Sequence, residues 1–261
     1  MVKVLPVEQL LLLSVGNTRT RLARVVEGKL QPAAVLENAD LATLDAGVAA
    51  AAADLPSGES AVLIASVNDA VADRLGAMLT GKGPRVYRFG PALPVPMIAN
   101  VPEPESTGVD RLLAAVGAFA RSAQACVIID AGTAITVDFV DQWGAFQGGC
   151  IAPGLKMMLR SLHEGTARLP LVETPREPPA EPLGRTTTQA MQRGCVAALV
   201  GMARLLIDQY AEMNKGYPRI VATGGDAPLL FEGDDVIEHV VPDLVLLGML
   251  ESWNRLCVSE E

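Results

Sequence analysis

The chain has 261 residues, half of them apolar, which is enough for one large domain or for two modest lobes with a core in each. Its formal net charge is −9 and its pI is near 4.8, and no basic cluster stands out. These values argue against nucleic acid or an anionic membrane as a general partner. The four cysteines form no CxxC pair and the two histidines lack a partner at ligand spacing, so we expect reduced thiols and no zinc site.

The sequence gives no sign of a membrane-spanning or exported protein. No uninterrupted apolar stretch reaches about 20 residues, the length that a spanning helix needs. The apolar run near the start is interrupted by Glu8 and lacks a small-residue cleavage site, so it differs from a signal peptide. We therefore expect a cytoplasmic protein.

The first part of the chain predicts an α/β lobe. Its expected elements, in order, are strands at 10–15, 19–26 and 30–36, a helix at 41–53, a strand at 61–65, a helix from Asn68 to about Leu79 and a strand at 85–89. Residues 76–83 read GAMLTGKG, close to a P-loop, but Gly83 stands where Ser or Thr would bind magnesium. The end of a helix followed by a turn explains these glycines better.

Five prolines between residues 91 and 104 predict an irregular crossing to a second lobe. A helix then begins near Ser106 or Thr107 and runs to about Arg121, with Asp110 in its first turn. A carboxylate there stabilises a helix by about 0.3–1 kcal/mol without any further function. Arg111 directly after it, beside the crossing, keeps a functional role for Asp110 open.

The second part of the chain repeats the opening pattern of the first. We expect strands at 126–130, 134–140 and 145–151, a helix at 155–163, a loop at 168–183, a helix at 186–213, strands at 219–222 and 236–240, and a helix at 243–256. Asp130, Gly132 and Thr133 end the first of these strands with a carboxylate, a bare backbone and a hydroxyl, as a phosphate and its cation require. A single such turn is also common in ordinary hairpins.

Here the turn occurs twice, because Ser14 aligns with Asp130 and Gly16 with Gly132. The repeat predicts an N-terminal lobe at 1–107 and a C-terminal lobe at 108–261, each contributing one turn to a shared cleft. It also exposes a difference, since the first copy has serine where the second has aspartate.

An ordered set of motifs then identifies a family resemblance. The segments are SVGNTRTR at 14–21, GVDR at 108–111, DAGTAITVD at 130–138, GGCIAPG at 148–154 and TGGDA at 223–227. This set resembles the type III pantothenate kinases, members of the sugar kinase, heat-shock chaperone and actin superfamily. The resemblance implies an α/β fold of two duplicated ribonuclease H-like lobes, as in actin-like ATPases, around a central cleft. It also implies ATP-dependent phosphorylation of pantothenate to 4′-phosphopantothenate, the first step of coenzyme A biosynthesis.

The resemblance further implies a homodimer that uses Mg²⁺ and a monovalent cation, K⁺ or NH₄⁺. Asp110 would be the general base, and Asp130 would hold the monovalent cation. Pantothenate would be bound by Gly108, Val109 and Arg111, with Thr187 reaching it from the partner subunit. The implied ATP-binding residues are Ser14, Gly16, Asn17, Thr18, Arg21, Thr133, Gly224 and Gly225. Gly16 allows a positive φ and close backbone approach.

Three positions depart from the family pattern. Ser14 replaces an aspartate that organises magnesium, Arg21 replaces a lysine, and Val101 replaces a tyrosine that contacts pantothenate. Loss of one electrostatic element of this kind commonly costs about 10²–10³ in rate, so reduced activity is expected. Two alternatives remain open: a silent homologue that binds nucleotide or pantothenate as a regulator, and a kinase of the same superfamily acting on another small hydroxylated substrate.

Overall fold

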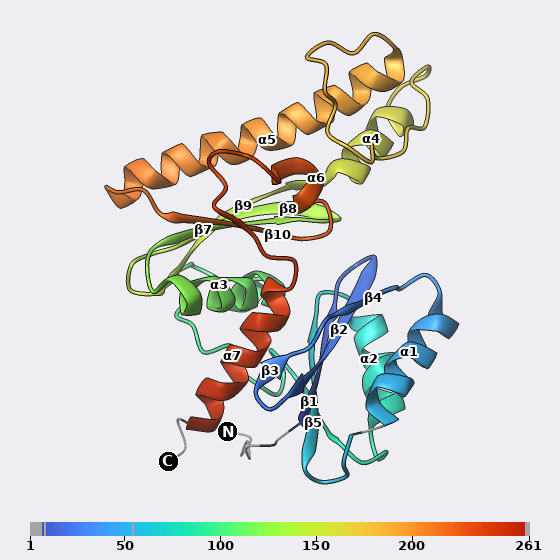
Figure 1. Ribbon diagram of the computed structural model, residues 1–261, viewed down its shortest axis with the longest axis vertical. Coiled ribbons are helices and arrows are strands. Elements are labelled where there is room, and N and C mark those ends of the chain that lie inside the picture. Colours follow the sequence, from blue (N-terminus) through green and yellow to red (C-terminus); the bar gives the residue numbers. More distant parts are fainter. Residues whose placement is uncertain (1–6, 8, 54, 259–261) are drawn as a thin grey trace. The chain divides into compact units, whose positions relative to one another are not determined.

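The computed structural model describes residues 7, 9–53 and 55–258. The first apolar run, which we expect not to be a signal peptide, begins in residues that lie mainly outside these ranges. The described chain is a mixed α/β protein with two separate sheets (Figure 1). It forms two compact units, of which the first joins the chain up to Ile98 with Pro102–Arg121 and the stretch from Asp243, and the second comprises Ala99–Val101 and Ser122–Pro242.

The first unit is built on a sheet with the strand order β3-β2-β1-β5-β6, in which β4 also pairs with β2. The β1 strand is antiparallel to β2 and parallel to β5. The expected strand at 30–36 is split because Pro32 has no N–H to continue the ladder. The elements are β1 (Gln9–Val15), β2 (Arg19–Val26), β3 (Lys29–Leu30), β4 (Ala34–Glu37), α1 (Leu41–Ala53), β5 (Ser60–Ser66), α2 (Asp69–Leu79) and β6 (Arg85–Arg88).

Both faces of β1 are buried. Leu11 and Leu13 pack into a cluster with residues of α1 and α2, which lie side by side in Figure 1. Leu10 and Leu12 point to the opposite face, into a cluster with α3 (Val109–Ser122) and α7 (Leu244–Val258). Burial on both sides explains why this strand is a continuous apolar run without alternating polar residues.

The helix α2 has the expected boundaries. The Asn68 side chain accepts a hydrogen bond from the backbone of Val71, which confirms it as the cap. The helix ends where the backbone N–H of Thr80 donates to the carbonyl of Gly76, and Gly81 and Gly83 adopt positive φ in the following turn. These glycines therefore terminate a helix and do not form a phosphate loop.

The helices α3 and α7 belong to the first unit, so its boundaries differ from a division after residue 107. They cross with their backbones in contact, because a Cβ on Gly117 would lie 2.6 Å from the carbonyl oxygen of Leu244. A Cβ on Gly248 would lie only 1.8 Å from the carbonyl oxygen of Leu113. A 3₁₀ turn at Pro104–Ser106 precedes α3, and the Ser106 hydroxyl donates to the carbonyl of Glu103 there.

The second unit contains a sheet with the order β11-β10-β7-β8-β9. The long helix α5 runs along this sheet, as Figure 1 shows in orange, and its buried side chains join the core with those of α4 and α6. The strand expected at 236–240 is confined to its last two residues. The elements are β7 (Cys126–Ala131), β8 (Ala134–Val140), β9 (Phe146–Pro153), α4 (Leu155–Glu164), α5 (Thr187–Asn214), β10 (Arg219–Thr223), α6 (Ala227–Phe231) and β11 (His239–Val240).

Among the described residues, α5 is the one helix long and apolar enough to cross a membrane by length and composition. A single helix of this kind is weak support for a span, since the core helix of a globular unit passes the same test. One row of its side chains, including Cys195, Leu199 and Ala203, lies in the core of the second unit.

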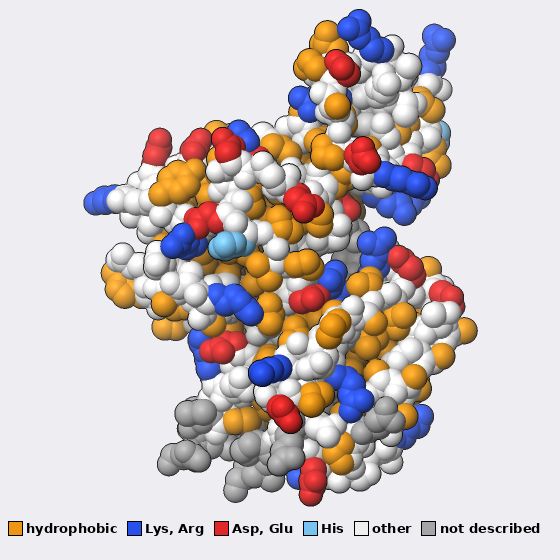
Figure 2. Space-filling view, in the orientation of Figure 1, with side chains coloured by type: hydrophobic (Ala, Val, Ile, Leu, Met, Phe, Trp, Pro, Cys, Tyr) orange, Lys and Arg blue, Asp and Glu red, His pale blue; other side chains and the backbone are white. Residues whose placement is uncertain are grey.

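The surface is mixed in character. Figure 2 shows charged side chains of both signs scattered over the face drawn, with apolar side chains between them. Among the described residues, the most exposed large apolar side chains are Trp143, at 79%, and Ile98, at 74%.

The crossing of α3 and α7 generates a stability prediction. Gly248→Ala forces the two backbones apart and should lower the free energy of unfolding by roughly 2 kcal/mol or more. Gly76→Ala in α2 is the matched control, because a Cβ there meets only Ile64 Cδ1, at 3.9 Å. That control should stabilise the protein by about 0.5–1 kcal/mol. Equal denaturant midpoints for the two variants would contradict the backbone contact.

Candidate active site

The first strand turn consists of Gly16, Asn17 and Thr18, between β1 and β2. The backbone N–H of Gly16 closes the turn by donating to the carbonyl of Arg19 at 2.9 Å. Its φ lies outside the left-handed region, so the freedom of glycine to adopt a positive φ is not used here. Glycine is favoured here by space instead, since a Cβ would lie 3.1 Å from the Arg19 carbonyl oxygen.

The carbonyl groups of this turn are held by asparagines from two other segments. Asn38, just after β4, donates from Nδ2 to the Gly16 oxygen and from its backbone to the Thr18 oxygen, each at 2.8 Å. Asn68 makes a longer contact of 3.5 Å from Nδ2 to the Asn17 oxygen. No local pattern singles out Asn38, because its partners lie about twenty residues away along the chain.

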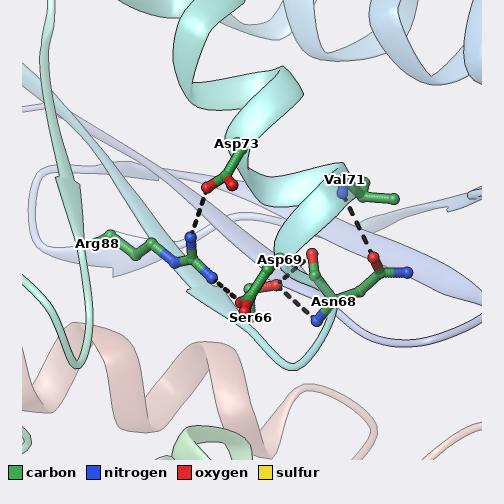
Figure 3. A network of polar contacts seen from close by, with 6 residues as sticks. All are labelled: Ser66, Asn68, Asp69, Val71, Asp73 and Arg88. Atoms are coloured by element: carbon green, nitrogen blue, oxygen red, sulfur yellow. Dashed lines mark hydrogen bonds and ion pairs between the residues drawn. The ribbon is translucent and has the colours of Figure 1, made fainter.

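Asn68 is itself fixed by the network in Figure 3. The hydroxyl of Ser66 accepts from the Asn68 backbone N–H and donates to its carbonyl, both at 2.9 Å. At the start of the same helix, Arg88 forms ion pairs with Asp69 and Asp73. These contacts anchor the connection from β5 to α2 beside the first turn.

Ser14 and Arg21 are direct neighbours across β1 and β2, and therefore share one face of the sheet. Ser14 is half-buried and brings no charge to the end of β1. The guanidinium of Arg21 instead contacts Asp243, with Nη2 2.7 Å from Oδ1. Sequence reasoning missed Asp243, which precedes α7 and lies far from Arg21 along the chain.

Asp110 lies in the first turn of α3, half-buried, with its carboxylate turned back toward its own backbone. Its Oδ1 accepts from the backbone N–H of Arg111 at 2.8 Å. A Cβ on Gly108 would lie 2.6 Å from the same oxygen, so a side chain at that position would displace the Asp110 carboxylate. Burial raises the pKa of Asp110 above its ordinary value, against the lowering effects of the Arg111 hydrogen bond and charge. Asp110 is therefore a stronger base than an exposed aspartate.

The second strand turn, between β7 and β8, has a related construction. Asp130 is half-buried at the end of β7 and lies beside Thr136 of β8 and Thr223 of β10. The backbone N–H of Gly132 donates to the carbonyl of Ala134 at 2.9 Å. A Cβ on Gly132 would meet its nearest atoms only at 3.8 and 3.9 Å, so the packing of the chain does not require glycine here.

A glycine turn after β10 packs directly on this site. Gly224 has a φ of +94°, and a Cβ on it would lie 2.3 Å from the Ala131 carbonyl oxygen and 2.5 Å from Asp130 Oδ1. Gly225 follows it and is exposed, as is Thr133 in the turn itself. The second unit thus brings together four of the predicted residues, namely Asp130, Thr133, Gly224 and Gly225.

The residues can accommodate a phosphate-bound magnesium ion. Mg²⁺ commonly uses one or two carboxylates together with substrate phosphates and water. The described residues contain no group of three His, Cys, Asp or Glu side chains that could hold a metal by themselves. Asp130, half-buried at the end of β7 and close to the exposed Thr133, supplies one carboxylate of the kind that a phosphate-bound cation uses.

The two remaining predicted positions lie in the second unit. Thr187 is exposed at the first position of α5, while the neighbouring Thr186 caps the helix by accepting from the Gln189 backbone at 3.2 Å. The Val101 side chain lies 3.5 Å from where a Cβ on Gly148 would be.

The family model and the relatives found by sequence agree on one family. The family model for type III pantothenate kinase matches residues 10–209. A type III pantothenate kinase of Akkermansia muciniphila is 40% identical over 150 residues, covering 58% of this chain and 61% of the relative. One from Hyphomonas neptunium is 34% identical over 166 residues, covering 63% of this chain and 64% of the relative. The chain thus matches less than two thirds of the length of these relatives.

Solved structures show the fold alone, because their sequences are distant. A conserved Campylobacter jejuni protein described as a Baf family transcriptional activator has a TM-score of 0.60 at 18% identity, covering 94% of this chain and 98% of the other. The ethanolamine utilization protein EutJ of Carboxydothermus hydrogenoformans has a TM-score of 0.52 at 14% identity, covering 96% and 92%. Because the family model spans most of the chain, including both strand turns and the GVDR segment, the chain belongs to the type III pantothenate kinase family.

Proposed function

We propose that the protein uses ATP to phosphorylate pantothenate to 4′-phosphopantothenate, the first step of coenzyme A biosynthesis. The observation that supports this most directly is the match of residues 10–209 to the type III pantothenate kinase family. The relatives from Akkermansia muciniphila and Hyphomonas neptunium are both named type III pantothenate kinase.

Asp110 is the general base of the proposed reaction. As the pantothenate hydroxyl oxygen bonds to the γ-phosphorus, its proton passes to the Asp110 carboxylate and the bond to the β-phosphate oxygen breaks, releasing ADP. The raised pKa of Asp110 favours proton uptake. Arg111 binds the pantothenate carboxylate as its counter-charge, with Gly108 and Val109 beside it. Thr187 contacts pantothenate from the partner subunit.

The two strand turns and the glycine turn bind ATP. Phosphoryl transfer depends mainly on positioning and charge neutralisation, which backbone N–H groups, hydroxyls and cations supply. Gly16, Asn17 and Thr18 hold phosphates in the first unit, and Thr133, Gly224 and Gly225 do so in the second. Asp130 holds the monovalent cation, K⁺ or NH₄⁺. Ser14 orients a water of the Mg²⁺ that accompanies ATP, and Arg21 lends positive charge.

We further propose a cytoplasmic homodimer. The outward side of α5 carries small and apolar side chains at Gly194, Ala197, Ala198, Gly201 and Leu205, all exposed. A Cβ added at Gly194 or Gly201 would meet nothing within 4 Å, so a second helix could approach closely. The same helix begins with Thr187, the residue proposed to act across the interface.

A second candidate is a catalytically silent homologue that regulates by binding nucleotide or pantothenate. Two observations favour it: Ser14 supplies no carboxylate at the end of β1, and Arg21 is held by Asp243. Val101, in the place of the family tyrosine, leaves room for a third candidate, a kinase of another small hydroxylated substrate.

A coupled assay of ATP turnover with pantothenate, with and without K⁺, distinguishes these functions. We expect wild-type turnover that requires both pantothenate and K⁺, and an increase of about 10²–10³ in Ser14→Asp because a carboxylate returns to the Mg²⁺ site. Ser57→Asp adds the same charge in an exposed turn and should leave turnover unchanged. A silent wild type that binds nucleotide would instead support the regulator, and turnover of only another hydroxylated substrate would support the third candidate.

The two turn glycines should respond differently to alanine. Gly132→Ala has space for its Cβ and should fold with nearly wild-type stability, yet its Kd for ATP should rise at least about 10-fold because the methyl group fills the phosphate site. Gly224→Ala combines a positive φ with a backbone clash and should lose about 2 kcal/mol or more of stability. Thermal unfolding and nucleotide titration measure both. Unchanged ATP affinity in a folded Gly132→Ala would remove the second turn from the nucleotide site.

Asp110→Asn should lose about 10²–10⁴ in turnover while gaining stability at neutral pH. Burial raises the folded-state pKa, so the ionised carboxylate disfavours folding at any pH above that pKa. This penalty disappears as the pH falls below the ordinary aspartate range near 4. The stability difference between variant and wild type should therefore be present at pH 7 and shrink toward pH 3 in denaturant titrations. A variant less stable at pH 7 would contradict the raised pKa.

A further inference from the structure

Asn38 lies outside every motif of the family resemblance, yet it forms two hydrogen bonds with the backbone of the first strand turn. It is 8% exposed, just beyond β4. Its side chain and backbone donate to the carbonyl oxygens of Gly16 and Thr18. Its own Oδ1 accepts from the hydroxyl of Thr20 at 2.7 Å, and Thr20 is fully buried.

These contacts fix the orientation of the Asn38 amide. The Gly16 carbonyl oxygen can only accept, so the NH₂ group of Asn38 is the end that points to it, and Oδ1 accepts from the Thr20 hydroxyl. A flipped amide would set two oxygens against each other at Gly16. Thr20 therefore holds Asn38, and Asn38 in turn holds the strand turn.

The planarity of the peptide bond gives this contact a consequence for ligand binding. The carbonyl of Gly16 and the N–H of Asn17 belong to one trans peptide, so they point in opposite directions. Asn38 draws the carbonyl toward itself and thereby directs the Asn17 N–H away, as a donor for an anion. It also keeps the partial negative charges of two carbonyl oxygens on the side away from that donor.

We propose that Asn38, buttressed by Thr20, is a positioning residue for the ATP phosphates. This inference rests on the proposed kinase function, in which Gly16, Asn17 and Thr18 bind those phosphates. Asn38 does not touch ATP itself. It sets the direction of the donors that do, so its loss weakens nucleotide binding more than pantothenate binding.

The test compares Asn38→Ala, Thr20→Val and the double variant with the wild-type protein. We expect Asn38→Ala to raise the Kd and KM for ATP roughly 10-fold, the effect of losing about one hydrogen bond, with the KM for pantothenate within about 2-fold. Thr20→Val preserves the side-chain shape and should give a smaller shift in the same direction. Thr20→Val should add little in the double variant, because both residues act through one contact.

Ser60→Ala is the matched control for a merely structural effect. Ser60 is fully buried and its hydroxyl donates to the Pro56 carbonyl, but it aligns with Gln9, at the opposite end of β1 from Ser14. Its loss should lower stability without changing the KM for ATP. Amide hydrogen exchange of residues 14–19 should become faster in Asn38→Ala and stay unchanged in Ser60→Ala.

The outcomes distinguish a failure of the kinase function from a failure of the positioning role of Asn38. A wild-type protein that binds no nucleotide would overturn both the kinase function and the role of Asn38. Nucleotide binding that is equally tight in wild type, Asn38→Ala and Thr20→Val would overturn the positioning role alone. If Asn38→Ala does not fold, Thr20→Val decides, since an unchanged KM for ATP in that variant would also overturn it.

Discussion

The first unit depends on one constraint, the burial of β1 on both faces. Leu10 to Leu13 are at most 3% exposed and alternate between two clusters, so shifting the strand by one residue would exchange every contact. Burying each of these side chains contributes roughly 1.5–3 kcal/mol. Since β2 and β5 are aligned on this strand, its register also determines where the first turn begins. The position of Ser14 and Gly16 is thus set by packing along the whole strand.

The two strand turns show the same construction with different charge. In the second unit Asp130 stands at the end of a buried strand, and Gly224 packs against its carboxylate. In the first unit the equivalent position is Ser14, and Arg21, which pairs with it on the neighbouring strand, forms an ion pair with Asp243. The carboxylate that pairs with the Arg21 guanidinium therefore comes from Asp243, in the segment before α7. An aspartate at position 14 would compete with Asp243 for the same guanidinium, which links the chemistry of this turn to the packing of α7.

Local patterns predicted most elements because their signals are short-range. The apolar runs gave β1, β7 and β8, and the Asn68 cap gave the start of α2, since both depend on neighbouring residues. The packing of α3 and α7 in the first unit did not follow from sequence, because it depends on the contact of Gly117 with Gly248. The motifs located the two turns, whereas Asn38 and Asp243 were missed because each meets its turn only through the fold. The roles of the predicted site residues stay predictions.

Glycines in these motifs serve different physical purposes. Some are explained by the packing of the chain, and others are not. Gly224 is needed by the chain itself, since its φ is +94° and a Cβ on it would lie 2.3 Å from the Ala131 carbonyl oxygen, and Gly108 leaves space that the Asp110 carboxylate occupies. Gly132 has no such need, because its φ is not positive and its surroundings have room for a methyl group. Packing therefore explains the first two without any ligand. Packing does not explain the third, so the proposed phosphate contact is a reason for glycine at position 132 that the fold itself does not supply.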